Sequence, residues 1–156
     1  MREGPPEDAQ LPKGPRIPPG RAMGVDLGAR RVGLALSDAE RVISSPHATI
    51  PMTSERALVQ NLKELCAERS VSLVVIGLPL SANGIEGPGC ARARRIAEAL
   101  QADGVSVKLQ DERWSSRDAE EILRETGKHR RSSREKVDAI AASLILSEYL
   151  REVSPP

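Results

Sequence analysis

Aromatic residues are almost absent from this chain of 156 residues, which contains no Phe, one Trp and one Tyr. The core must therefore consist of Val, Ile, Leu and Ala, and a chain of this length can bury such a core without disulfides or metal ions. Cys66 and Cys90 are too few for a disulfide framework and lack the spacing of metal ligands. An excess of charge is missing as well, because the formal net charge is +1. Local basic patches must consequently hold any nucleic-acid partner.

Long apolar segments are also missing. No run approaches the roughly 20 residues of a membrane-spanning helix, and the N-terminus has no apolar segment of the kind found in signal peptides. Residues 1–20 instead contain six Pro and three Gly, a composition typical of disorder. We therefore expect a cytoplasmic protein with a disordered tail at 1–20, one domain at 21–151 and a short C-terminal tail at 152–156.

Five segments have the apolar patterns of β-strands: 22–27, 32–37, 42–50, 72–77 and 105–109. The first three are separated by short turns, which is typical of an antiparallel meander, and the third is interrupted near Pro46. The fourth is a continuous apolar run, as expected of a central strand buried on both faces. Helices are expected at about 54–69, at about 90–102 after a Pro- and Gly-rich loop, from Ser115 or Ser116 to Gly127, and in a last segment that carries Asp138. This order predicts an α/β fold with a mixed sheet and right-handed crossovers.

Acidic residues occur where strands end or a helix begins: Asp26, the pair Asp111 and Glu112, and Asp138. In open α/β sheets, ligands bind beyond the carboxyl ends of the strands. Asp138 begins a stripe of small and apolar residues with helical spacing, which puts it on the sheet-facing side of the last helix. We therefore expect these carboxylates to converge at one edge of the sheet.

Carboxylates gathered in this way suit Mg²⁺ or Mn²⁺, which prefer hard oxygen ligands and keep water and phosphate in their coordination shell. A pair of such ions can activate a water and stabilise the leaving oxygen in phosphodiester cleavage. Each residue taken alone has a simpler interpretation, as a turn former, a helix N-terminal acid or a surface charge. For Asp111 three roles stay open: metal ligand, support for a ligand, or pairing partner of Arg113.

Basic residues are concentrated just before and within the start of the last helix: Lys128, Arg130, Arg131, Arg134 and Lys136. Lys and Arg contacts to phosphate would give salt-dependent affinity for nucleic acid, and a solvated basic loop is the alternative. Arg92, Arg94 and Arg95 are expected to form a solvated helix face.

Three residues beside the acidic positions are further candidates for substrate contacts. Arg31 lies in the turn after the first strand, and we expect it to contact phosphate. Arg113 either clamps phosphate or orients the neighbouring Glu112. Trp114 either stacks a splayed base or packs against its own domain.

Four groups of residues resemble the motifs of the YqgF family, also called RuvX, within the RNase H-like superfamily. They are Val25-Asp26-Leu27-Gly28 with 31–35 and Ser37-Asp38, Gly77-Leu78-Pro79-Leu80 with Gly84 and 86–88, Asp111-Glu112-Arg113 with Ser115-Ser116, and 137–142 with Ile145-Leu146. The match covers about Ala22 to Leu150. Ser81 and Trp114 stand where the family usually has Asn and an aliphatic residue, and neither change removes an expected metal ligand.

The resemblance implies an RNase H-like fold, a five-stranded mixed sheet with helices on both sides. It also implies a metal-dependent nuclease with Asp26, Glu112 and Asp138 as the acidic triad. Two substrates come with it: the 5′ end of precursor 16S ribosomal RNA and the Holliday junction. A junction resolvase cuts two symmetric strands and is expected to be a homodimer, whereas a nuclease that trims ribosomal RNA can act as a monomer.

Two other functional classes compete with a nuclease. A nucleic-acid-binding scaffold without catalysis is disfavoured because all three acidic positions are retained. An ATPase of the actin or sugar-kinase type is disfavoured because it needs a second domain and a second phosphate-binding loop.

Overall fold

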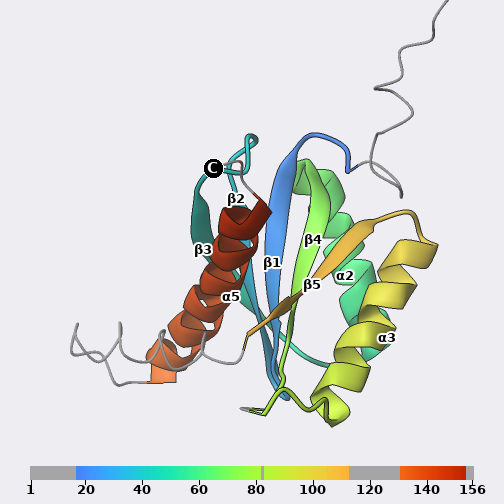
Figure 1. Ribbon diagram of the computed structural model, residues 1–156, viewed down its shortest axis with the longest axis vertical. Coiled ribbons are helices and arrows are strands. Elements are labelled where there is room, and N and C mark those ends of the chain that lie inside the picture. The colour runs from blue at the N-terminus through green and yellow to red at the C-terminus, as the bar shows by residue number, and fades with distance from the viewer. Residues whose placement is uncertain (1–16, 82, 113–130, 154–156) are drawn as a thin grey trace, which may run out of the picture.

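The computed structural model describes residues 17–81, 83–112 and 131–153, with the backbone alone for residues 131–134. Five strands form one sheet in the order β3-β2-β1-β4-β5, as Figure 1 shows. The strands are β1 (Arg21–Leu27), β2 (Arg31–Ser37), β3 (Ser44–Pro51), β4 (Val71–Leu78) and β5 (Ser106–Asp111). The described helices are α2 (Glu55–Arg69), α3 (Pro88–Ala102) and α5 (Arg131–Val153). The predicted five-stranded mixed sheet is confirmed, while the helix expected between Ser115 and Gly127 lies outside the described residues.

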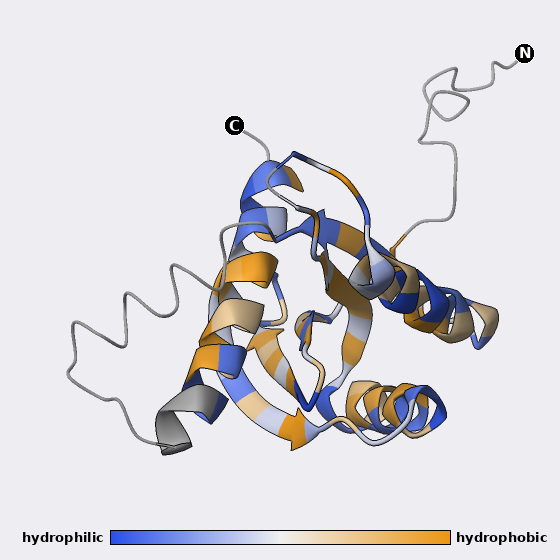
Figure 2. Cartoon of the chain, turned by 90° about the horizontal axis from the view of Figure 1, so that it is seen from below, coloured by the Kyte–Doolittle hydropathy of each residue, from blue (hydrophilic) through white to orange (hydrophobic). Residues whose placement is uncertain are grey.

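Helices cover both faces of the sheet. α5 lies against one face, and α2 and α3 lie against the other (Figures 1 and 2). β4 contributes to the apolar core on each side, because Val74 and Ile76 pack with the α2 and α3 residues whereas Leu73 and Val75 pack with α5. Its continuous apolar run is therefore that of a central strand buried on both faces, as the sequence predicts.

β1, β2 and β3 form the predicted antiparallel meander. A tight turn joins β1 to β2, in which the Gly28 amide donates to the carbonyl of Arg31 at 2.8 Å. In the next pairing, Leu34 lies opposite Ala48 whereas Ala35 lies opposite Pro46, so His47 is an extra residue at a bulge. Pro46 is tolerated there because β3 is an edge strand, where a missing amide donor interrupts no inner pairing.

α2 and α3 begin with residues that are typical of helix N-termini. The Ser54 hydroxyl accepts a hydrogen bond from the Ala57 amide at 3.0 Å at the start of α2. α3 begins at Pro88 rather than at Cys90 as expected from the sequence. Pro is well placed at the first helical position, because that position has no use for an amide donor and its fixed φ suits a helix.

α5 lies directly on the sheet because glycines on β1 and β2 leave room for its backbone. A Cβ atom on Gly24 would come within 2.5 Å of the Ala142 carbonyl oxygen, and one on Gly33 within 2.0 Å of the Asp138 carbonyl oxygen. The predicted apolar stripe of α5 is buried, namely Ala141, Ala142, Ile145 and Tyr149, and Leu146 is buried beside it. The close approach of helix and sheet brings Asp138 to the sheet surface.

The segment before β1 is described from Ile17 onward. Ile17 packs against the apolar cluster beneath α5, and the Pro18 carbonyl accepts hydrogen bonds from Arg41 at 2.6 Å and from Ser72 at 2.9 Å. Within the described residues, no helix is long and apolar enough to cross a membrane.

Candidate active site

Asp26 and Glu112 meet at the carboxyl end of β4. Asp26 lies on β1 two residues after Gly24, so it points to the same face, toward α5. Glu112 follows β5 directly, and its amide donates to the Leu78 carbonyl at 3.3 Å. The two acids come from the strands on either side of β4, and a hydrogen bond joins their side chains.

Gly77 provides the space in which the two carboxyl groups meet. It lies on β4 between the two flanking strands, opposite Gln110 on β5. A Cβ atom at this position would come within 2.6 Å of Glu112 Oε1 and within 2.7 Å of Ile145 Cδ1. A side chain larger than hydrogen would therefore displace the Glu112 carboxyl from the site.

Burial dominates the electrostatics of this carboxyl pair. It raises the pKa of Glu112 to about 9, with further increases from the negative charge of Asp26, the hydrogen bond to Asp26 and the charge of Asp111. Burial also raises the pKa of Asp26; the hydrogen bond from Glu112 lowers it and the charge of Asp138 raises it. The higher pKa of Glu112 favours it as the group that keeps a proton and donates to Asp26, since two close carboxylates in a buried site do not both ionise.

One oxygen of the pair has no partner within the described part of the chain. Glu112 Oε1 is buried and accepts no hydrogen bond from any described residue. Such an atom in a folded protein needs an explanation, and an ion is one of the few groups that can satisfy it. A hard divalent cation fits the oxygen donors present and would replace the shared proton.

Asp138 lies near this pair but is engaged by a cation of the protein itself. Its Oδ2 accepts a hydrogen bond from Arg31 Nε at 2.6 Å, and its negative charge contributes to the raised pKa of Asp26. Among the described residues, no group of three or more His, Cys, Asp or Glu side chains is arranged to hold a metal ion. The structure therefore brings Asp26 and Glu112 together, with Asp138 adjacent and paired to Arg31.

The other expected site residues are described unequally. Asp111 is the exposed last residue of β5, and its charge contributes to the raised pKa of Glu112. Arg131 begins α5, but its side chain is not described. The remaining candidates lie outside the described residues: Arg113, Trp114, Lys128 and Arg130.

Arg92 is a residue that sequence reasoning misjudged, because it is not part of a solvated face. Its Nη2 donates to the Gly28 carbonyl at 2.9 Å, and its Nε is buried without a partner in the part of the chain that the structure describes. This contact ties α3 to the turn that follows Asp26. Arg94 and Arg95 do lie on the exposed face, where they pair with Glu86 and Glu55.

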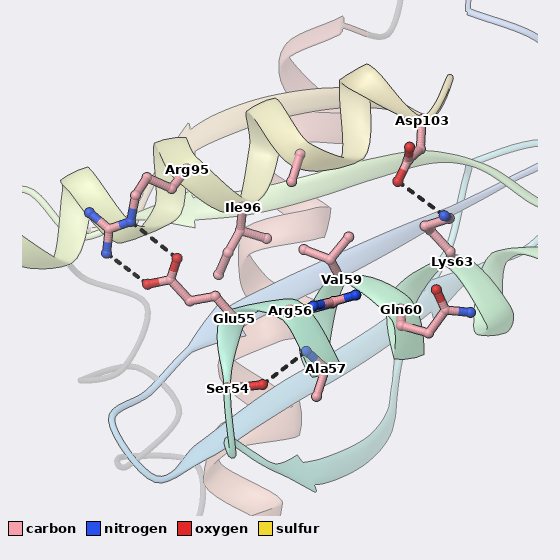
Figure 3. Close-up of a pocket in the computed structure, with 11 residues that line it drawn as sticks. Ser54, Glu55, Arg56, Ala57, Val59, Gln60, Lys63, Arg95, Ile96 and Asp103 are labelled. Atoms are coloured by element: carbon pink, nitrogen blue, oxygen red, sulfur yellow. Dashed lines mark hydrogen bonds and ion pairs between the residues drawn. The ribbon is translucent and has the colours of Figure 1, made fainter.

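A separate groove of about 720 Å³ lies between α2 and α3. Figure 3 shows Val59 and Ile96 facing each other across it, with the Glu55–Arg95 ion pair (2.7 Å) at one end and the Lys63–Asp103 ion pair (3.0 Å) at the other. Because α2 and α3 cover the face of the sheet opposite α5, this groove is not part of the acidic site.

The chain has clear relatives. The family model described as RuvX, Holliday junction resolvase, matches residues 20–152. A protein of Chloroflexus aggregans named "Putative pre-16S rRNA nuclease" is 41% identical over 82% of this chain and 91% of its own length. A protein of the same name from Myxococcus xanthus is 39% identical over 87% of this chain and 91% of its own length.

Solved structures share the fold at low identity. RuvC of T. thermophilus in complex with a Holliday junction substrate superposes with a TM-score of 0.53 and 12% identity, over 86% of this chain and 96% of that one. The Fowlpox virus resolvase in complex with Holliday junction DNA superposes with a TM-score of 0.55 and 8% identity, over 86% of this chain and 99% of that one. The predicted RNase H-like fold is thereby confirmed, and the chain belongs to the RuvX family of Holliday junction resolvase-like nucleases.

Proposed function

We propose that this protein is a metal-dependent endonuclease that matures the 5′ end of precursor 16S ribosomal RNA in the cytoplasm. The observation that carries the chemistry is the buried Asp26–Glu112 pair, whose Glu112 Oε1 has no hydrogen-bond partner among the described residues. The relatives that share about 40% identity over most of their length support the choice of substrate.

The acidic residues would hold the metal in stages. Asp26 and Glu112 already share a hydrogen bond, so replacing their proton by Mg²⁺ or Mn²⁺ requires little movement. Asp138 would complete the set once Arg31 releases it. Such ions would supply an activated water and stabilise the leaving oxygen of the phosphodiester. Asp111, exposed and on the strand beside Glu112, would act from outside the coordination shell.

Basic residues around the site would bind the nucleic acid. Lys128, Arg130 and Arg131 precede or begin α5, which carries Asp138, and Arg113 follows Glu112 directly. Their phosphate contacts would give an affinity that falls steeply with salt. Trp114 would stack an unpaired base.

A second candidate function is resolution of Holliday junctions. The description of the matching family model and the folds of two junction-bound resolvases favour it. A resolvase acts on two symmetric strands, so this function requires a homodimer. Sedimentation of the protein with and without a four-way junction distinguishes a monomeric RNA nuclease from a dimeric resolvase.

The test is a cleavage assay with Mg²⁺ or Mn²⁺. The substrates are a single-stranded RNA that carries the precursor 5′ extension and a four-way DNA junction. Wild type is compared with Asp26→Asn and with Asp103→Asn, a matched control because Asp103 pairs with Lys63 on the other side of the sheet. We expect metal-dependent cleavage of the RNA by wild type and by Asp103→Asn, and loss of cleavage in Asp26→Asn.

Two outcomes would change the proposal. Cleavage of the junction in preference to the RNA would select the second function. Binding of either substrate by a folded wild type without any cleavage would instead select a non-catalytic scaffold.

A further inference from the structure

Arg31 and Asp138 form an ion pair across the interface between the sheet and α5. Arg31 Nε lies 2.6 Å from Asp138 Oδ2, although the two residues are 107 positions apart in the chain. The side chains of Arg31 and Asp138 are 35% and 20% exposed. The pair therefore lies at the edge of the acidic site, where the guanidinium can leave without unpacking the core.

The pair faces the same space as the buried carboxyl groups. Asp26 lies opposite Gly33, and Arg31 lies two residues before Gly33 on the same face of β2. The Asp138 carbonyl touches the position of the missing Gly33 side chain, so the α5 residue sits directly above this part of the sheet. The negative charge of Asp138 is close enough to Asp26 to interact with it electrostatically. Arg31 thus places a positive charge beside a cluster of acids.

A guanidinium and a divalent ion cannot both occupy the space next to Asp138 without strong repulsion between like charges. Arg31 is also well suited to a different partner, because its planar set of donors matches two phosphate oxygens at once. Its partly exposed position at the start of β2 leaves room for it to turn toward a strand of nucleic acid that lies over the site.

We propose that Arg31 is an exchangeable counter-ion of this site, which neutralises Asp138 in the metal-free protein and moves to a substrate phosphate when a divalent ion takes Asp138. The inference rests on the proposed function, because it requires a metal site at the acidic residues. It adds a coupling: metal and substrate bind together more tightly than each binds alone, because metal binding frees the arginine that the substrate needs.

The test compares Mn²⁺ binding by calorimetry, without nucleic acid, in wild type, Arg31→Gln and Arg30→Gln. Arg30 is the matched control, because it is exposed in the same turn and its removal changes the net charge equally. We expect Arg31→Gln to bind Mn²⁺ about two- to fivefold more tightly than wild type, the range expected for loss of a partly exposed ion pair. Arg30→Gln should stay close to wild type.

The second readout is binding of a short single-stranded RNA in Ca²⁺. Arg31→Gln should bind it more weakly, with a slope of log affinity against log salt reduced by about one phosphate contact. Arg31→Lys keeps the charge without the planar donors, and we expect it to restore part of the RNA affinity. Circular dichroism of each variant shows whether the fold is intact.

Each outcome bears on a different part of the reasoning. Equal Mn²⁺ affinity in wild type and Arg31→Gln, with metal-dependent cleavage intact in wild type, overturns the counter-ion role and leaves the proposed function standing. The same tightening in Arg30→Gln also overturns it, because a general field effect then suffices. Absence of Mn²⁺ binding in all three proteins overturns both proposals.

Discussion

Replacement of Gly33 by Ala tests whether the absence of a side chain at this position is what lets α5 pack directly on the sheet. A Cβ atom there would lie 2.0 Å from the Asp138 carbonyl oxygen and 2.3 Å from its carbon, whereas ordinary contact begins near 3.4 Å. The obstacle is the backbone of a helix, which cannot turn aside as a flexible side chain can. α5 must therefore move away by about 1 Å or more, which we expect to destabilise the fold by about 3 kcal/mol, at the upper end for overpacking.

The assay is urea unfolding followed by circular dichroism, with Gly87→Ala as the matched control. Among the described residues, nothing lies within 4 Å of a Cβ added at Gly87, and its φ of −120° is open to any residue. Gly87 is the N-cap of α3, a position where Gly is preferred to Ala, so the control should lose at most about 1 kcal/mol relative to wild type. Equal stability of Gly33→Ala and Gly87→Ala would refute the close packing of α5 and, with it, the position assigned to Asp138.

Three further predictions follow from burial. The pKa of Glu112 is raised from 4.5 to about 9 in the folded protein, so the folded state holds more protons than the unfolded state between these pH values. The unfolding free energy of the metal-free protein should therefore fall as the pH rises from 5 to 9, by at most about 1.4 kcal/mol per pH unit. The unfolding free energy of Glu112→Gln, measured over the same pH range, should not show this slope. Burial raises the pKa of the Cys66 thiol to about 11, so a disulfide reagent at pH 8 should label it much more slowly in the native protein than in urea; equal rates would contradict its burial. Leu62→Ala should lower the unfolding free energy by about 2–5 kcal/mol in urea titrations, because Leu62 is fully buried in the core beneath α2; a loss below about 1 kcal/mol would show that the core closes around the gap.

The sheet could be predicted from the sequence because its strands differ in burial in ways that leave clear patterns. β4 reads as one apolar run because both of its faces are covered, and the meander shows short turns between apolar segments. The start of α3 was expected two residues late, since Pro88 signals a loop as readily as a first helical turn. The sequence indicated the bulge at His47 only as an interruption of the strand near Pro46.

The acidic site was predictable in part. Asp26 and Glu112 end strands that flank the same central strand, so their meeting follows from sheet order once β4 is recognised. The role of Gly77 was not predicted, because a glycine after an apolar run usually marks the end of a strand, and only the structure shows it against Glu112. The sequence suggested that Arg31 contacts phosphate. Its pairing with Asp138 joins residues 107 positions apart and depends on how closely α5 lies on the sheet.

The most direct test of the account is diffraction from crystals soaked in Mn²⁺, with data collected at the manganese absorption edge. We predict an anomalous peak next to Asp26 and to Glu112 Oε1, which has no partner among the described residues, with Arg31 no longer hydrogen-bonded to Asp138. A peak at any other group of residues, or none at saturating Mn²⁺ in crystals of active protein, would contradict the assignment of the metal site.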